Sequence, residues 1–239
     1  MLDPAIYAQL LDAADAHPVL RAALVAAGPI TVAPPTHAHV ADRLFVEVVN
    51  QQLSTRAAAA IWARIEAAAA AAGLGPRGLF ETGDGDRLRA CGLSGNKVRA
   101  IQAIVAAEAA GLLGPGLAGL PHPERAAILC GIRGVGPWTA DMVGIFHFRD
   151  PDIWPGGDVA AVGCLRRLTG QDDTSAVAAR FAPYRSILAR YLWHIKDTGA
   201  VAAEPAALPR TPQPGPVEGG GIRVTGGRGS AIGRRRPGP

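Results

Sequence analysis

The sequence predicts an all-α fold. Two alanine-rich runs, Ala57–Ala60 and Ala67–Ala72, favour helix because alanine has the highest helix propensity of all residues. Sustained alternation of β-branched and polar residues is absent, and the one strand-like segment, Ile30–Val32, is too short to found a sheet. At 239 residues, the chain has the length of one large domain or of two small lobes.

The first part of the chain shows helix starts and stops. Residues 3–26 have the pattern of one or two amphipathic helices, which break at His17-Pro18 and end at Gly28-Pro29. A later apolar helix ends near Val49, and the next begins at Ser54-Thr55. The polar residues between these two helices predict an exposed loop, a common place for binding contacts.

A glycine-rich hairpin separates two further helices. A short helix opens near Pro123, and a longer one begins at Pro137 because proline is favoured at the first helical position. Apolar residues spaced along one face extend the second helix through Phe146, and we expect it to end before Pro151. The hairpin core between them is Gly131–Gly136.

The hairpin glycines have two readings. Gly134 and Gly136 can adopt positive φ and carry no Cβ, so the backbone amides at the start of the Pro137 helix can approach an anion such as a phosphate. The alternative is a plain helix–loop–helix turn, in which glycine only ends one helix and starts the next.

A lone carboxylate follows the next turn. Asp158 comes directly after the turn Trp154–Gly157 and begins a helix over Val159–Leu168. By itself, an aspartate in this place is explained as a helix N-cap, which stabilises by about 1 kcal/mol.

The last helical block has an apolar face. Its members are Tyr184, Leu188, Tyr191 and Ile195, and their shared face favours core packing.

The C-terminal segment differs in composition from the rest. Residues 201–239 hold six arginines and two glutamates, so this segment carries the whole net charge of +4 and the remaining body is neutral. The segment is rich in proline and glycine and has no periodicity, which predicts disorder. We therefore expect a helical domain over residues 1–200 and a tail over 201–239.

Other classes of protein are disfavoured. The sequence has no apolar window of membrane-spanning length and no signal-peptide pattern at its start, so we expect a soluble cytoplasmic protein without a membrane partner. Cys91, Cys130 and Cys164 lie far apart and favour reduced thiols. His147 and His194 have no partners at metal-ligand spacing, and we expect no metal site of side chains.

Five ordered blocks together resemble a known superfamily. They are VNQQLSTRAAAAIWARI (49–65), LRACGLSGNKVRAIQAI (88–104), GIRGVGPWTAD (131–141), WPGGDVAAVGCLRRL (154–168) and APYRSILARYLWHI (182–195). The sequence resembles the helix-hairpin-helix base-excision DNA glycosylases, and within them the alkylated-base branch of DNA-3-methyladenine glycosylase II, over residues 40–197. The resemblance implies two helical lobes with a helix-hairpin-helix near 123–148 and a DNA-binding active-site cleft between the lobes. It also implies a monomer acting on double-stranded DNA with damaged bases.

The resemblance assigns roles to single residues. Asp158 takes the place of the family's catalytic aspartate, which would stabilise positive charge on the deoxyribose. Trp138 stands where relatives that also cut the backbone have a nucleophilic lysine, which implies a monofunctional enzyme that leaves an abasic site. Trp138 and Met142 would line the base pocket, although core packing of Trp138 is the alternative.

The remaining roles concern DNA contacts. Gln52 is the expected wedge that fills the place of the flipped base, with Leu53 as second choice. By the same resemblance, Gly134, Gly136 and Thr139 would bind phosphate. In the last block, either Arg185 or Trp193 could reach the cleft.

The resemblance also bears on cofactors. Some superfamily relatives end in a four-cysteine iron-sulfur loop, but no cysteine follows Cys164, so no iron-sulfur cluster is expected. A monovalent cation at the hairpin carbonyls is implied by the family, and no other cofactor is required. Two alternative functions stay open: a glycosylase for oxidised or mismatched bases, and a non-catalytic hairpin protein that only binds DNA. Asp158 and the QQLS block favour an enzyme, because a simple binding module needs neither.

Overall fold

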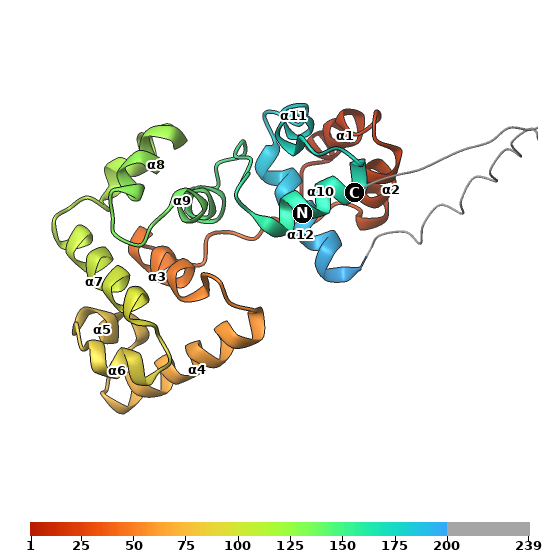
Figure 1. Cartoon of the computed structure of the whole chain (residues 1–239). Coiled ribbons are helices and arrows are strands. Elements are labelled where there is room, and N and C mark those ends of the chain that lie inside the picture. The colour runs from red at the N-terminus through yellow and green to blue at the C-terminus, as the bar shows by residue number, and fades with distance from the viewer. Residues whose placement is uncertain (200–239) are drawn as a thin grey trace, which may run out of the picture. The chain divides into compact units, whose positions relative to one another are not determined.

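The structure, a computed structural model, describes residues 1–199, and its regular elements there are all helical, with no strand (Figure 1). The predicted all-α class is confirmed. The expected tail over 201–239 lies outside the described residues. The helices are α1 (Pro4–Ala13), α2 (Pro18–Ala27), α3 (Val40–Asn50), α4 (Thr55–Ala71), α5 (Pro76–Glu81), α6 (Gly85–Ala90), α7 (Gly95–Ala109), α8 (His122–Cys130), α9 (Pro137–Val143), α10 (Val159–Thr169), α11 (Thr174–Ala179) and α12 (Arg185–Thr198), with a 3₁₀ turn η1 (Pro115–Gly119) and a π-helical turn η2 (Gly144–Phe148).

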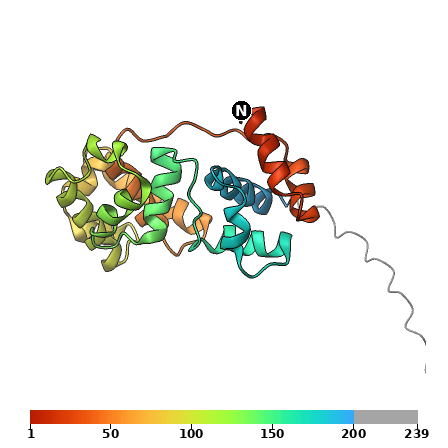
Figure 2. The same cartoon turned by 90° about the horizontal axis from the view of Figure 1, so that it is seen from above.

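The helices form two lobes, each with its own core (Figures 1 and 2). The middle of the chain, from α3 to α9, encloses a core that includes Leu44, Phe45 and Ile101. The two ends of the described chain build the other lobe, in which α1 and α2 lie beside α10, α11 and α12. Apolar burial in these two cores is the main stabilising contribution to each lobe.

The N-terminal helices begin and end near the predicted residues. The Asp3 side chain caps α1 by accepting the backbone N–H of Ala5 at 2.8 Å, and α2 ends at Gly28, whose φ is +62°. Buried Tyr191 of α12 fastens the segment that follows: its hydroxyl donates to the Gly28 carbonyl at 2.9 Å and accepts from the Ile30 N–H at 3.3 Å. These bonds tie the first two helices to the last one.

The helix after the hairpin differs from the prediction. We expected one helix from Pro137 to the approach of Pro151, but the α-helix ends at Val143 and continues as the π-helical turn η2. At Gly144 the backbone packs so closely that a Cβ would lie 2.4 Å from Ile153 Cδ1. The apolar stripe runs on through this change, so periodicity alone does not reveal the wider turn.

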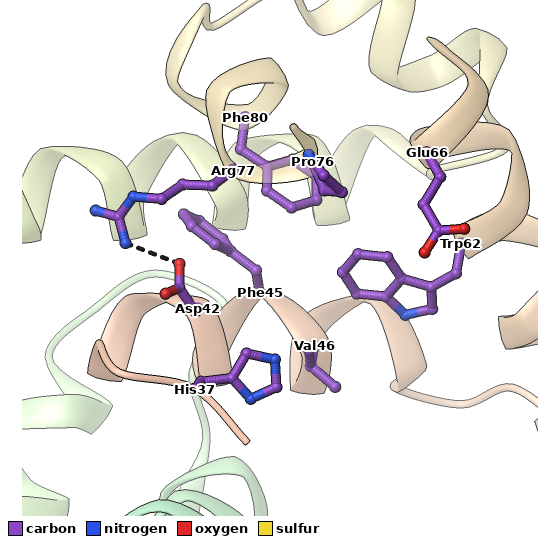
Figure 3. A pocket seen from close by; sticks show the side chains of 9 residues that line it. All are labelled: His37, Asp42, Phe45, Val46, Trp62, Glu66, Pro76, Arg77 and Phe80. Atoms are coloured by element: carbon purple, nitrogen blue, oxygen red, sulfur yellow. Dashed lines mark hydrogen bonds and ion pairs between the residues drawn. The ribbon is translucent and has the colours of Figure 1, made fainter. Parts of the chain in front are cut away.

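A separate pocket of about 380 Å³ lies in the first lobe (Figure 3). Aromatic rings line it, with the Phe45 and Phe80 centroids 4.7 Å apart and Trp62 packed edge-on against Phe80. Arg77 forms ion pairs at its rim, including one to Asp42 at 2.8 Å. No residue predicted for the functional site lines this pocket.

Among the described helices, none has both the length and the apolar character needed to cross a membrane.

Candidate active site

Asp158 holds three hydrogen bonds at the start of α10. Its Oδ1 accepts the backbone N–H of Ala161 at 2.7 Å, so the carboxylate does cap the helix. The same oxygen accepts the indole N–H of Trp193 at 2.9 Å, and Oδ2 accepts that of Trp138 at 2.9 Å. Trp138 comes from α9 in the first lobe and Trp193 from α12 in the second, so the half-buried carboxylate is fixed by indoles from both lobes.

A small apolar cluster lies next to this carboxylate. Met142, Ile145 and Ile153 are buried, and Trp138, Phe146 and Trp193 pack against them while half-buried themselves. Indole faces beside a fixed carboxylate can stack on a planar base and attract one that carries positive charge.

Two guanidinium groups contact the ring of Phe146, which stacks on Trp193 with centroids 5.5 Å apart. Arg43 of α3 and Arg190 of α12 each lie 4.5 Å from the Phe146 centroid. Burial lowers the pKa of Arg190, whose guanidinium also donates to the Ile145 carbonyl at 2.8 Å. Cation–π contacts from both lobes therefore meet on one ring.

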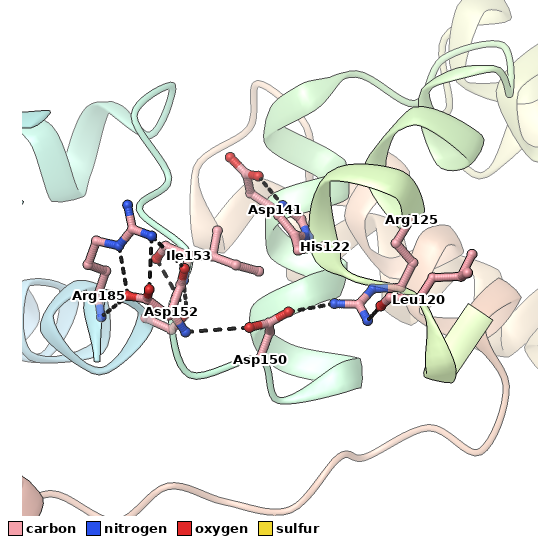
Figure 4. A network of polar contacts seen from close by, with 9 residues as sticks. Leu120, His122, Arg125, Asp141, Asp150, Asp152, Ile153 and Arg185 are labelled. Atoms are coloured by element: carbon pink, nitrogen blue, oxygen red, sulfur yellow. Dashed lines mark hydrogen bonds and ion pairs between the residues drawn. The ribbon is translucent and has the colours of Figure 1, made fainter. Parts of the chain in front are cut away.

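Ion pairs fix the segment that leads from η2 to Asp158 (Figure 4). Arg125 of α8 binds Asp150 at 2.7 Å, which anchors the segment to the first lobe. Arg185 of α12 binds Asp152 at 2.7 and 2.9 Å, which anchors it to the second lobe. The bonds from Arg185 lower the pKa of the Asp152 carboxyl. The turn that presents Asp158 is thus held from both sides.

The hairpin packs on α7 through Gly134. Gly134 has φ +85°, and a Cβ there would lie 2.3 Å from the Cβ of Ala100, so only glycine fits. At the start of α9, the first intrahelical bond is donated by Ala140 to the Gly136 carbonyl. The backbone N–H groups before Ala140 have no intrahelical acceptor, which is the geometry that suits an anion.

The loop between α3 and α4 is tied to this hairpin. The Gln51 side-chain amide donates to the Gly134 carbonyl at 3.1 Å and to Thr139 Oγ1 at 3.0 Å. Lys97 Nζ donates to the carbonyls of Val49 and Gln51, both at 2.9 Å, and burial lowers its pKa. Exposed Gln52 has φ +56°, a left-handed conformation that is strained for a residue with a side chain.

No protein-family model matches the sequence. Comparison with single proteins is informative: the chain is 30% identical over 166 residues to DNA-3-methyladenine glycosylase 1 of Schizosaccharomyces pombe, across 64% of this chain and 70% of that protein. The chain belongs to the DNA-3-methyladenine glycosylase family.

Solved structures support the same fold for this family member. The S. pombe 3-methyladenine DNA glycosylase Mag1, solved in complex with abasic DNA, aligns with a TM-score of 0.72 over 82% of this chain and 98% of that one, at 24% identity. A DNA-3-methyladenine glycosidase from Bacillus halodurans aligns with a TM-score of 0.64 over 80% and 90% of the two chains, at 27% identity. The resemblance drawn from the five sequence blocks is confirmed.

The glycosylase structure brings several predicted residues together. Asp158, Trp138 and Met142 lie at one place, and of the two candidates in α12 Trp193 reaches it while Arg185 binds Asp152 instead. Their roles in catalysis and in the base pocket stay predictions. Gln52 and Leu53 lie on the separate loop, and Leu53 is 37% exposed.

The structure adds detail to two expectations about the hairpin. Gly136 has φ −105°, an ordinary extended value, and an added Cβ would meet no atom within 4 Å, so this glycine does not use the positive φ that is open to it. Thr139 is 1% exposed and its hydroxyl accepts the bond from Gln51, so the side chain is not open to a phosphate. Only the backbone N–H of Thr139, in the first turn of α9, is placed for that role.

Sequence reasoning missed Arg43 and Glu47 of α3. Glu47 is 4% exposed and pairs with Arg43. Burial raises the pKa of the Glu47 carboxyl, Arg43 opposes that rise, and the charge of Asp158 adds to it. The sequence offered one signal for a functional acid here, a charged residue between the core positions Phe45 and Val48. Without knowledge of the neighbouring helix, such a residue is interpreted as facing solvent.

Proposed function

We propose that this protein is a monofunctional DNA glycosylase, which flips alkylated purines such as 3-methyladenine out of duplex DNA and hydrolyses their bond to the sugar. The observation that carries the proposal is the Asp158 carboxylate fixed between two indoles in a member of this family. The monomeric protein would bind one damaged site in the duplex at a time.

The chemistry follows from charge. As the bond between C1′ and the base nitrogen breaks, its electron pair leaves with the base and positive charge develops on the sugar. A preorganised carboxylate at Asp158 stabilises that charge without reorganising. Water then bonds to C1′ and its proton passes to solvent or to the departing base, which leaves an abasic site in an intact strand.

The indoles suit an alkylated base. Alkylation at a ring nitrogen leaves the base in the nucleotide positively charged, and the faces of Trp138 and Trp193 attract such a ring by stacking and cation–π interaction. The cost of flipping is a few kcal/mol. The exposed loop with Gln52 and Leu53 would fill the vacated stack.

The absence of a suitable amine supports hydrolysis. The chain has two lysines. Lys97 Nζ binds two backbone carbonyls, and Lys196 is exposed near the end of α12. The position next to Asp158 holds Trp138, which cannot form an imine with the sugar.

A monovalent cation at the hairpin is compatible with the backbone there. The Ile132 carbonyl accepts one N–H, from Val135, and the Gly134 carbonyl accepts one, from Gln51, so each has a lone pair left for a cation. Bound there, the cation would add positive charge beside a phosphate. Replacing sodium and potassium by a bulky organic cation at equal ionic strength should then weaken binding to every duplex.

Release of free bases from methylated duplex DNA tests the function. Asp158→Asn should abolish release and leave DNA affinity unchanged or slightly raised, because the carboxylate stabilises the transition state but repels phosphate. Asp173→Asn is the matched control: the Asp173 side chain caps α11 by accepting the backbone N–H of Ala176 at 3.0 Å and bonds to neither indole. Unchanged excision by Asp158→Asn, or release of only oxidised or mismatched bases by the wild type, would refute the proposal.

A further inference from the structure

Three polar residues form a stripe along α3. Arg43, Glu47 and Gln51 follow one another at four-residue spacing, so their side chains share one face of the helix. Contacts fix both ends of the stripe: the Arg43 guanidinium lies 4.5 Å from the Phe146 centroid, and the Gln51 amide donates to Thr139 at 3.0 Å.

The facing stripe belongs to α9 and η2: α3 packs on α9, and Arg43 of α3 contacts Phe146 of η2. Between Thr139 and Phe146 on this stripe lies Met142, one of the three buried residues of the apolar cluster against which Trp138 and Trp193 pack. With its two neighbours in the α3 stripe paired to the two ends, Glu47 comes to the level of Met142. The Glu47 carboxylate pairs with Arg43, whose guanidinium contacts Phe146 of the apolar cluster, so it lies at the edge of that cluster.

The hydrogen bonds of Glu47 are incomplete. Its Oε1 pairs with Arg43, and within residues 1–199 no donor bonds to Oε2. Arg43 Nε is likewise buried without a partner among the described residues. Glu47 Oε2 is not fully buried, so it is open to a donor from outside the protein, and the buried Arg43 Nε left unpaired beside it is costly for stability and calls for a ligand or water. Two carboxylates near one site, in different environments, are also typical of separate functional roles.

We propose that Glu47 is a specificity-determining residue that accepts an N–H from the exocyclic amino group of the flipped base. This inference rests on the proposed function. An ionised carboxylate is an acceptor only. It pairs with the amino group of an alkylated adenine, whereas the carbonyl at the same ring position of guanine or hypoxanthine would face it as a second acceptor.

Such a mismatch discriminates strongly, because a buried polar group is left unpaired when the wrong base binds. The negative charge of Glu47 also favours a cationic base. Arg43 holds the carboxylate in one geometry and balances its charge when the site is empty. The site therefore selects 3-methyladenine over 7-methylguanine and over the neutral base hypoxanthine.

The ratio of excision rates tests the assignment. Glu47→Gln removes the charge but keeps the shape, and we expect kcat/KM for 3-methyladenine to fall about tenfold relative to 7-methylguanine, the loss of one charge-assisted hydrogen bond. Glu47→Asp keeps a carboxylate acceptor on a shorter side chain. It should therefore retain part of the preference for 3-methyladenine over 7-methylguanine that Glu47→Gln loses. Glu108→Gln is the matched control, since Glu108 lies in the same lobe and pairs with Arg77 at 2.6 Å rather than with Arg43. An unchanged ratio in folded Glu47→Gln would overturn the proposal.

Binding of free bases separates this inference from the function itself. Quenching of tryptophan fluorescence by 3-methyladenine and by 7-methylguanine reports occupancy of the indole site even if no excision occurs. Wild-type protein and Asp158→Asn should both prefer the adenine, and Glu47→Gln should lose that preference. If Glu47→Gln does not fold, Glu47→Asp is compared with wild type by the same titration. Equal preference in wild type and variant would reject the role of Glu47, whatever the outcome for catalysis.

Discussion

The indole N–H of Trp193 lies 2.9 Å from Oδ1 of Asp158, the same oxygen that caps α10. One carboxylate thus joins the start of one helix to a wall of the proposed base site. Because Trp138 holds the other oxygen from the opposite lobe, the orientation of Asp158 depends on both lobes at once. The carboxylate plane is fixed before substrate arrives, which is the condition for electrostatic stabilisation of the transition state.

Removing the Trp193 N–H should therefore affect turnover more than binding. We expect Trp193→Phe to keep an aromatic wall and to lower kcat about tenfold, the effect of one lost hydrogen bond to a charged group, with little change in KM. Single-turnover excision rates measure this. Trp154→Phe is the control, because the Trp154 indole N–H is buried without a partner among the described residues and its removal should cost nothing. An equal loss in both variants would contradict the role given to Trp193.

The two hairpin glycines should respond differently to valine. Gly134→Val places a Cβ against Ala100 in a left-handed conformation, which should cost about 1–3 kcal/mol from backbone strain alone and lower the melting temperature. Gly136→Val meets no atom and should leave stability unchanged. It should instead weaken binding to damaged and undamaged duplexes alike, since phosphate contacts carry no sequence information. Thermal denaturation and fluorescence anisotropy check the pair, and a binding defect confined to damaged DNA would place Gly136 in the base site.

Gln51 should matter only when a base must be flipped. Gln51→Leu removes the two bonds that tie the loop with Gln52, the proposed wedge, to the hairpin, so Gln52 should fill the vacated stack less well. Excision from a fully paired duplex is expected to fall several-fold more than excision of the same lesion in a bulge, where little unstacking is needed. Single-turnover rates on the two DNAs give the comparison. Equal losses on both would show that Gln51 acts through stability alone.

The features recovered from the sequence are those set by local rules. The helix breaks at His17-Pro18 and Gly28, the hairpin and the cap at Asp158 depend on residues near in sequence, and all were found. Glu47 was not found, because the helical periodicity of α3 puts it off the apolar face and so favours exposure to solvent. In the structure, α9 packs on α3 and Glu47 is buried. The burial of the Thr139 side chain was also not apparent from the sequence, because its partner Gln51 comes from a distant part of the chain.

The pair of Asp152 and Arg185 should make stability depend on pH. Hydrogen bonds from Arg185 lower the pKa of Asp152 in the folded protein, so the pair stabilises fully above the unfolded pKa near 3.8 and loses its effect as pH falls through the folded pKa. Both side chains are about one third exposed, so Asp152→Asn should cost at most about 1 kcal/mol at pH 7, and less in high salt. Denaturant unfolding from pH 7 down to pH 3 should show the difference from wild type shrinking below pH 3.8. Asp15→Asn, in a more exposed pair with Arg21, is the control; a difference that grows on acidification would be inconsistent with this linkage.

Trp138 marks the difference between hydrolysis and strand cleavage. With wild-type protein, we expect an intact strand bearing an abasic site, cleaved only on alkali treatment, and no covalent adduct after borohydride reduction, because no amine reaches the sugar. Trp138→Lys should gain little cleavage activity. Its ammonium would lie beside Asp158, whose charge would raise the lysine pKa and keep the amine protonated, and the bond that orients the carboxylate would be lost. A borohydride-trapped adduct with wild-type protein would refute the hydrolytic mechanism, and comparing Lys97→Arg with Lys196→Arg would then identify the nucleophile.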